Sequence, residues 1–122
     1  MHRIGPASIR LMPERRQLVA DGQDTVPIAV AVVDSRGRVV PTADNKIVFE
    51  VSGAGSNAGV GNGDPSCHEP NQGDYRSAFK GYCMVLAQAG RRPGTIHVTA
   101  SSDGLSSASL KLTAAKASGQ PL

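Results

Sequence analysis

Short stretches in which apolar and polar residues alternate recur along this chain and are separated by turn-forming residues. In the clearest stretch, from Lys46 to Ser52, the residues Ile47, Phe49 and Val51 share one parity, which means that they occupy every second position and would point to the same side of a strand. Alternation of this kind is typical of a β-strand with one buried face. Similar stretches cover residues 7–11, 17–20, 26–33, 76–79, 82–87, 95–101 and 108–112. These lengths and spacings predict a sandwich of two β-sheets without helices.

The stretch 26–33 differs from the others because both parities are apolar. Such a strand is expected to be central in its sheet and covered on both faces, with Pro27 near its beginning. The alternation also predicts which side chains meet between the two sheets. They are Ile28, Val30, Phe49, Val51, Val85, Ile96, Val98 and Leu110.

Residues 53–74 are rich in glycine and lose the alternation, so we expect an irregular connection in which at most residues 57–60 pair at a sheet edge. Asp64 is expected to cap the turn at Asn62, and Glu69 to accept backbone N–H bonds. The alternative is that Asp64, His68 and Glu69 form a chemical site, either an acid–base pair or a cation site. It is disfavoured because a glycosidase holds two carboxylates across a cleft, which a small sandwich does not offer.

Cys67 and Cys83 are the only cysteines. They can form a disulfide if the protein is exported. Otherwise Cys83 is a buried thiol on a strand and Cys67 an unrelated thiol in the connection. Zinc binding by these residues and His68 is disfavoured by their spacing, and nothing in the sequence predicts a cofactor.

Composition narrows the possible functions. Two Phe, two Tyr and no Trp leave few rings for a platform on which sugars or bases stack. The net charge is +3 and its basic residues are scattered, so no nucleic-acid partner is expected. No apolar stretch approaches the roughly 20 residues of a membrane span, and no membrane partner is expected either.

Residues 60–70 and 76–81 form a distinctive pattern, and residues 18–24, 33–45 and 49–53 fit with it. These stretches resemble the immunoglobulin-like domain that follows the catalytic barrel in bacterial β-galactosidases of glycoside hydrolase family 2. The resemblance extends over about residues 7–113. Its most specific parts are residues 60–70 and 76–81. It implies an all-β, immunoglobulin-like two-sheet sandwich of about seven to eight short antiparallel strands. The family's catalytic glutamates belong to the barrel, and no position here matches their motifs.

The resemblance also implies a role. Residues 6–114 would form the sandwich, with residues 1–5 and 115–122 as linkers. The expected function is a non-catalytic accessory domain of a β-galactosidase-like hydrolase, packed on neighbouring domains of the same chain and located in the periplasm or secreted. Asn62, Asp64, His68, Glu69 and Tyr75 would form its structural turn and docking loop. A carbohydrate-binding module, with carbohydrate as partner, and an adhesin-type repeat are the alternatives.

Overall fold

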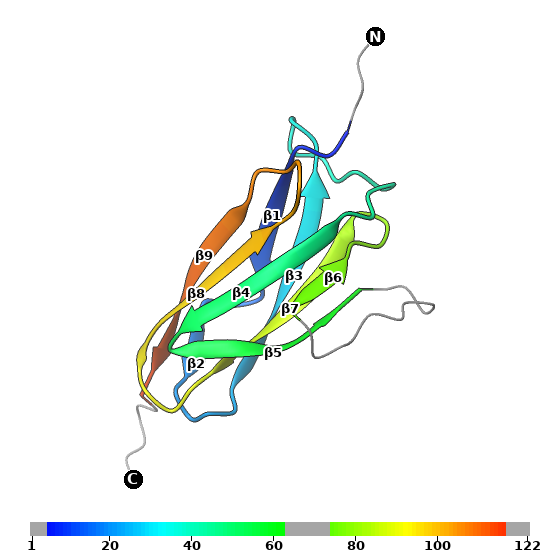
Figure 1. Cartoon of the computed structure of the whole chain (residues 1–122). Helices are drawn as coiled ribbons and strands as arrows, with labels where there is room; N and C mark the ends of the chain where they lie inside the picture. The colour runs from blue at the N-terminus through cyan, green and yellow to red at the C-terminus, as the bar shows by residue number, and fades with distance from the viewer. Residues whose placement is uncertain (1–4, 63–73, 117–122) are drawn as a thin grey trace.

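The computed structural model describes residues 5–62 and 74–116, and every regular element among them is a β-strand (Figure 1). Since this part of the chain has no helix, it has none long and apolar enough to cross a membrane. The strands are β1 (Ser8–Pro13), β2 (Gln17–Val19), β3 (Thr25–Val33), β4 (Lys46–Gly53), β5 (Gly55–Gly61), β6 (Tyr75–Ser77), β7 (Tyr82–Ala89), β8 (Gly94–Ser101) and β9 (Ala108–Ala115).

The strands form two stacked sheets, as the alternation predicted. One has four strands in the order β1-β3-β7-β5, and the other has five in the order β2-β9-β8-β4-β6. This matches the immunoglobulin arrangement, in which strands A, B, E and D face strands C, F and G. Among the described strands only β8 and β9 are consecutive neighbours in one sheet, so every other connection carries the chain between the sheets. The fold class is therefore confirmed.

Strand β2 is a correction to the expected antiparallel arrangement. It pairs in parallel with β9, with Leu18 opposite Ala114. The chain leaves the four-stranded sheet at Pro13 and joins the five-stranded sheet at Gln17. Because β1 and β2 run onward in the same direction on opposite sheets, β2 meets the last strand in parallel. Alternation within a strand carries no information on the direction of its partner.

The core lies between the two sheets, and six of the eight predicted core residues are buried there: Ile28, Val30, Phe49, Val85, Ile96 and Val98. Val51 and Leu110 are corrections, since both are only partly buried. They flank Val98 in one cross-strand row, and Val98 itself is fully covered. In β9 the buried side chains are instead those of Leu112 and Ala114, which lie at the end of the strand that pairs with β2.

The segment from Gly55 to Gly61 is a further correction, because it forms a complete edge strand where an irregular connection was expected. This strand, β5, pairs with β7, and a bulge shifts its register between Asn57 and Gly59. The Asn57 side-chain oxygen accepts a 2.8 Å bond from the Gly59 N–H within the bulge. The bulge and the glycines break the alternation, which is why the sequence pattern concealed the strand.

Strand β3 is central in its sheet, between β1 and β7, as predicted. Its inward side chains are fully buried. On its outward face Ala31 and Val33 are buried, Pro27 is half-buried and Ala29 is exposed. Within the described chain, the outward face is therefore covered over only part of the strand.

Candidate functional site

The residues proposed for the connection after β5 are only partly within the described structure. Asn62 directly follows β5, and Tyr75 begins β6. The others lie outside the described residues, and their predicted roles stay predictions: Asp64, Cys67, His68 and Glu69.

Asn62 joins the two sheets at one end of the sandwich. Its side-chain amide donates a 2.6 Å hydrogen bond to the backbone oxygen of Ser77. Ser77 belongs to β6 in the five-stranded sheet, whereas Asn62 directly follows β5 in the four-stranded sheet. The predicted turn residue therefore has a structural role in holding these two short edge strands together.

Arg76, a residue that the sequence pattern did not indicate, makes a second link between the same strands. Its side chain is buried between the sheets, and Nη2 donates a 3.4 Å bond to the backbone oxygen of Val60. Arginine is almost never fully buried unless it is paired. No local pattern in the sequence indicates this burial, because Arg76 points into the core through its pairing opposite the inward-facing Ile47.

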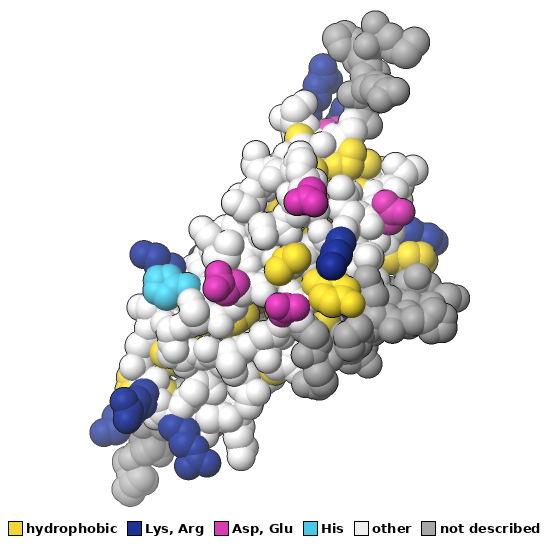
Figure 2. All heavy atoms as spheres, in the orientation of Figure 1, with side chains coloured by type: hydrophobic (Ala, Val, Ile, Leu, Met, Phe, Trp, Pro, Cys, Tyr) yellow, Lys and Arg dark blue, Asp and Glu magenta, His cyan; other side chains and the backbone are white. Residues whose placement is uncertain are grey.

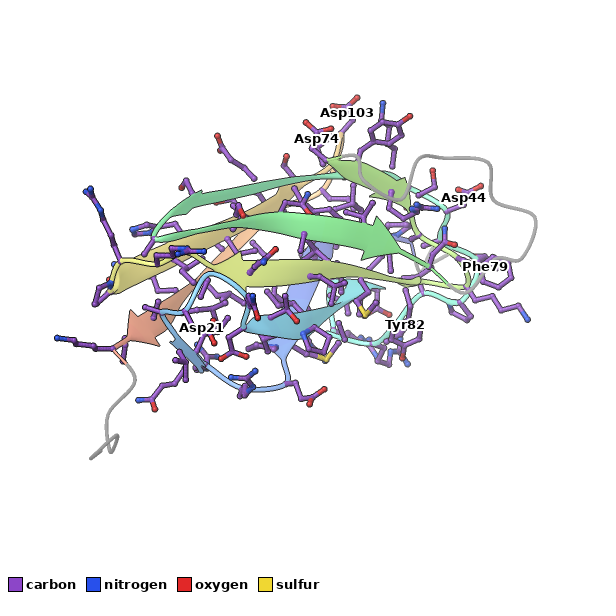
Figure 3. The ribbon with its side chains drawn as sticks, turned by 90° about the horizontal axis from the view of Figure 1, so that it is seen from below. Asp21, Asp44, Asp74, Phe79, Tyr82 and Asp103 are labelled. Carbon is purple, nitrogen blue, oxygen red and sulfur yellow. The ribbon has the colours of Figure 1, made fainter. Side chains whose placement is uncertain are left out.

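Tyr75 lies on the outer face of the five-stranded sheet, beside a shallow hollow. The Lys46 ammonium nitrogen lies 4.2 Å from the centre of the Tyr75 ring, a cation–π contact. Figure 3 shows Asp74 and Asp103 together on this side of the sandwich, and Figure 2 shows acidic side chains spread over the same face. The hollow has a volume of about 400 Å³ and is lined by Asn45, Lys46, Val48, Ser101, Ser102 and Asp103.

The hollow is polar, and among the described residues the aromatic ring beside it is Tyr75, one face of which already contacts Lys46. A sugar stacks on a free aromatic face, and Lys46 occupies one face of Tyr75. Lys46 is itself held in place at its backbone, where its oxygen accepts a 2.7 Å bond from the Ser102 hydroxyl. The arrangement is therefore better suited to keeping an edge of the sheet ordered than to stacking a ligand.

Two carboxylates outside this region have structural partners that stabilise their charged form. The Arg15 guanidinium, followed by the Val19 N–H, holds the pKa of Asp24 below its usual range. The backbone N–H groups of Arg38 and Arg36 do the same for the pKa of Asp34.

A lowered pKa is the opposite of what a general acid in glycoside cleavage needs. Asp24 and Asp34 instead hold backbone turns together, because each accepts hydrogen bonds from backbone N–H groups. Among residues 5–62 and 74–116, no group of three or more His, Cys, Asp or Glu side chains is arranged to hold a metal ion.

Cys83 is buried on β7, on the strand face that points between the sheets. Cys67, its proposed disulfide partner, lies outside the described residues, so the pairing stays a prediction.

Comparison with known proteins agrees with this architecture. The family model for the glycoside hydrolase family 2 C-terminal domain 5 matches residues 9–111. Beta-galactosidase BoGH2A of Bacteroides ovatus is 45% identical over 109 residues, which are 89% of this chain and 13% of that protein.

Among solved structures, a glycosyl hydrolase family 2 member from Bacteroides cellulosilyticus superimposes with a TM-score of 0.89 at 32% identity. The match covers 93% of this chain and 15% of that one. The D00-D0 domain of intimin matches with a TM-score of 0.64 over 93% of this chain and 48% of that one. Its identity is 16%, so this likeness shows the fold alone.

The chain thus spans less than a sixth of the length of the hydrolases it matches. Its alternating strands, its two-sheet topology and the family match agree with the resemblance read from the sequence. This chain belongs to the glycoside hydrolase family 2 C-terminal domain 5 family.

Proposed function

We propose that this chain is a non-catalytic accessory domain of a β-galactosidase-type hydrolase, and that it acts by packing against neighbouring domains of the same polypeptide. The observation that carries the proposal is the 45% identity to a stretch that makes up 13% of Beta-galactosidase BoGH2A. Two described carboxylates, Asp24 and Asp34, are committed to backbone turns, which supports a structural role.

The carbohydrate-binding alternative gains less support. Stacking of a sugar needs an open aromatic face, and Lys46 covers one face of Tyr75. The adhesin alternative has the fold-level likeness to intimin in its favour and no more.

We also propose that the parent protein is exported to the periplasm or secreted, as the resemblance to bacterial β-galactosidases suggests. Cell fractionation with an antibody against this domain tests the location. Recovery of the protein in the cytoplasm alone would contradict it.

The function itself is tested with three proteins: this chain alone, the full-length parent, and the parent with this domain deleted. With a nitrophenyl β-galactoside, we expect turnover by the full-length parent and none above the buffer blank by this chain alone. We expect the deletion to lower the thermal midpoint of the parent. Turnover by the isolated chain that survives repurification would overturn the non-catalytic assignment, and an unchanged midpoint would contradict the packing role.

A further inference from the structure

The outer face of the four-stranded sheet carries a row of apolar side chains that the core does not use. Met12 on β1 lies directly opposite Ala29 on β3, which lies opposite Met84 on β7. Residues paired in this way in an antiparallel sheet point to the same side. Both methionines are 37% exposed and Ala29 is also exposed, so the row lies open at the surface.

Two further residues of β7 extend this row along the strand. Tyr82 and Leu86 share the parity of Met84, and Tyr82 is 48% exposed. We call Met12, Ala29, Met84, Tyr82 and Leu86 the outer apolar face. In Figure 3 Tyr82 lies on the side of the sandwich away from Asp74 and Asp103, which mark the outer side of the other sheet.

Charge is nearly absent from the strands of this sheet. Among the residues of the described strands β1, β3, β5 and β7, Arg10 is the only charged one. Arg10 lies at the rim, opposite Ala31, and donates a 2.8 Å bond to the backbone oxygen of Gly37. An antiparallel sheet with one face in water normally alternates apolar inward and polar outward residues. The middle of this sheet does not, because Met12, Ala29 and Met84 point outward there.

The outer face of the five-stranded sheet provides the internal contrast. Lys46 and Glu50 on β4, His97 on β8 and Lys111 on β9 are exposed there. Figure 2 shows these kinds of charged side chain distributed over that face. One side of the sandwich is therefore suited to water, and the other is suited to contact with protein.

The outer apolar face also has a recess that can receive a side chain. Gly61 lies opposite Met84 and places no side chain beside it. A hollow of about 270 Å³ is lined there by Gly61, Asn62, Tyr82, Cys83 and Met84. Flexible methionines next to a small recess adapt well to an apolar partner surface.

We propose that the outer apolar face docks against another domain of the same hydrolase polypeptide, through an apolar and uncharged surface on that domain. The proposal rests on the proposed function and names the surface through which it acts. The matched hydrolase chains are more than six times as long as this one, so most of such a polypeptide lies outside this domain and can supply the partner. The exposed outer side of β3, a strand apolar at both parities, is then covered in the parent.

Methionine oxidation measures this contact at the residues that make it. Hydrogen peroxide converts an exposed thioether to the sulfoxide, with water as the other product, and the rate follows exposure. We expect Met12 and Met84 to oxidise about tenfold or more slowly in the full-length parent than in this chain alone. A matched control is Val48→Met on the opposite face, where Val48 is 41% exposed. That methionine should oxidise at the same rate in both proteins.

A second experiment disrupts the proposed contact by substitution in the parent. Met84→Lys should restore the oxidation rate of Met12 toward its value in the isolated chain and lower the thermal midpoint of the parent. Val48→Lys should do neither. Both substitutions should leave the thermal midpoint of the isolated chain nearly unchanged, which shows that the domain still folds.

Equal oxidation of Met12 and Met84 in the parent and in the isolated chain would overturn the docking surface, even if deletion of the domain destabilises the parent. Protection that appears in the isolated chain and grows with its concentration would also overturn it, because a second copy would then be the occupant. A parent without glycosidase activity would refute the proposed function separately, whatever the methionine rates.

Discussion

Arg15 and Asp24 form a two-bond ion pair at the point where the chain changes sheets, with N–O distances of 3.1 and 2.6 Å. The Arg15 guanidinium also donates to the backbone oxygens of Gln17 and Thr25, at 2.7 and 2.9 Å. Asp24 in turn accepts the Val19 N–H at 2.7 Å. One pair therefore fixes both ends of β2 and the start of β3, which places β2 beside β9.

Arg15→Ala removes this pair together with two bonds to backbone oxygens. We expect the free energy of unfolding to fall by about 1–2 kcal/mol, because bonds to charged groups contribute more than neutral ones but this pair is partly in water. The control is Arg16→Ala, which alters the neighbouring exposed arginine and leaves its backbone bond to Thr113 in place. Urea unfolding of both variants measures the difference, and equal losses would show that the ion pair contributes nothing specific.

Asp24 and Asp34 predict how stability depends on pH. The pKa of each carboxyl is lowered in the folded protein, so each contributes its full stabilisation above the pKa of the unfolded chain. That contribution is lost as the pH falls through the folded pKa. The thermal midpoint should therefore be steady near neutrality and should fall as the pH drops below about 4.

The double variant Asp24→Asn, Asp34→Asn tests the cause of this decline. It should be less stable than the wild type near pH 7, and its midpoint should change less between pH 5 and pH 2.5. A decline as steep as that of the wild type would assign the acid sensitivity to other carboxyl groups.

Phe49 and Val48 are neighbours on β4 that face opposite ways, and they test the register of that strand. Phe49 is 2% exposed, so Phe49→Ala should cost about 3–5 kcal/mol through lost burial and a cavity. Val48→Ala should change stability by less than about 0.5 kcal/mol, because Val48 lies on the outer face. A shift of one residue would reverse the two results. Chemical denaturation of the two variants therefore checks the register directly.

The parts of the fold that the sequence predicted are those that depend on local alternation. The stretch from Lys46 to Ser52 has one apolar parity, and that parity faces the core. Strand β5 could not be predicted in full because three of its seven residues are glycines and a bulge interrupts it. Its extended shape comes from pairing with β7, which no local pattern records.

The candidate site was less predictable for a related reason. Tyr75 was expected to be part of a docking loop, but the contact of its ring with Lys46 depends on the register between β6 and β4. The burial of Arg76 depends on the same register. The outer apolar row of Met12, Ala29 and Met84 needs the order of three strands that are distant in the sequence.

Gly53 and Gly104 provide a matched pair for testing the turn that carries the chain from β4 to β5. Both have φ near +80°, a conformation that costs a residue with a Cβ about 1–2 kcal/mol. At Gly104 a Cβ would meet open space, whereas at Gly53 it would overlap the backbone oxygen of Thr95. That oxygen accepts a 2.9 Å bond from Ala54, so the overlap would also disturb the bond that starts the turn.

Gly104→Ala should therefore show only the conformational cost. Gly53→Ala should lose a further 1–3 kcal/mol, about the cost of forcing extra volume into a packed site. Thermal and urea unfolding of the two variants measures the difference. Because the backbone conformation is nearly the same at both positions, an excess loss at Gly53 isolates the steric contact with Thr95. Equal losses would show that β4 and β8 can separate at this end without cost, and that the close approach at Thr95 does not hold the turn in place.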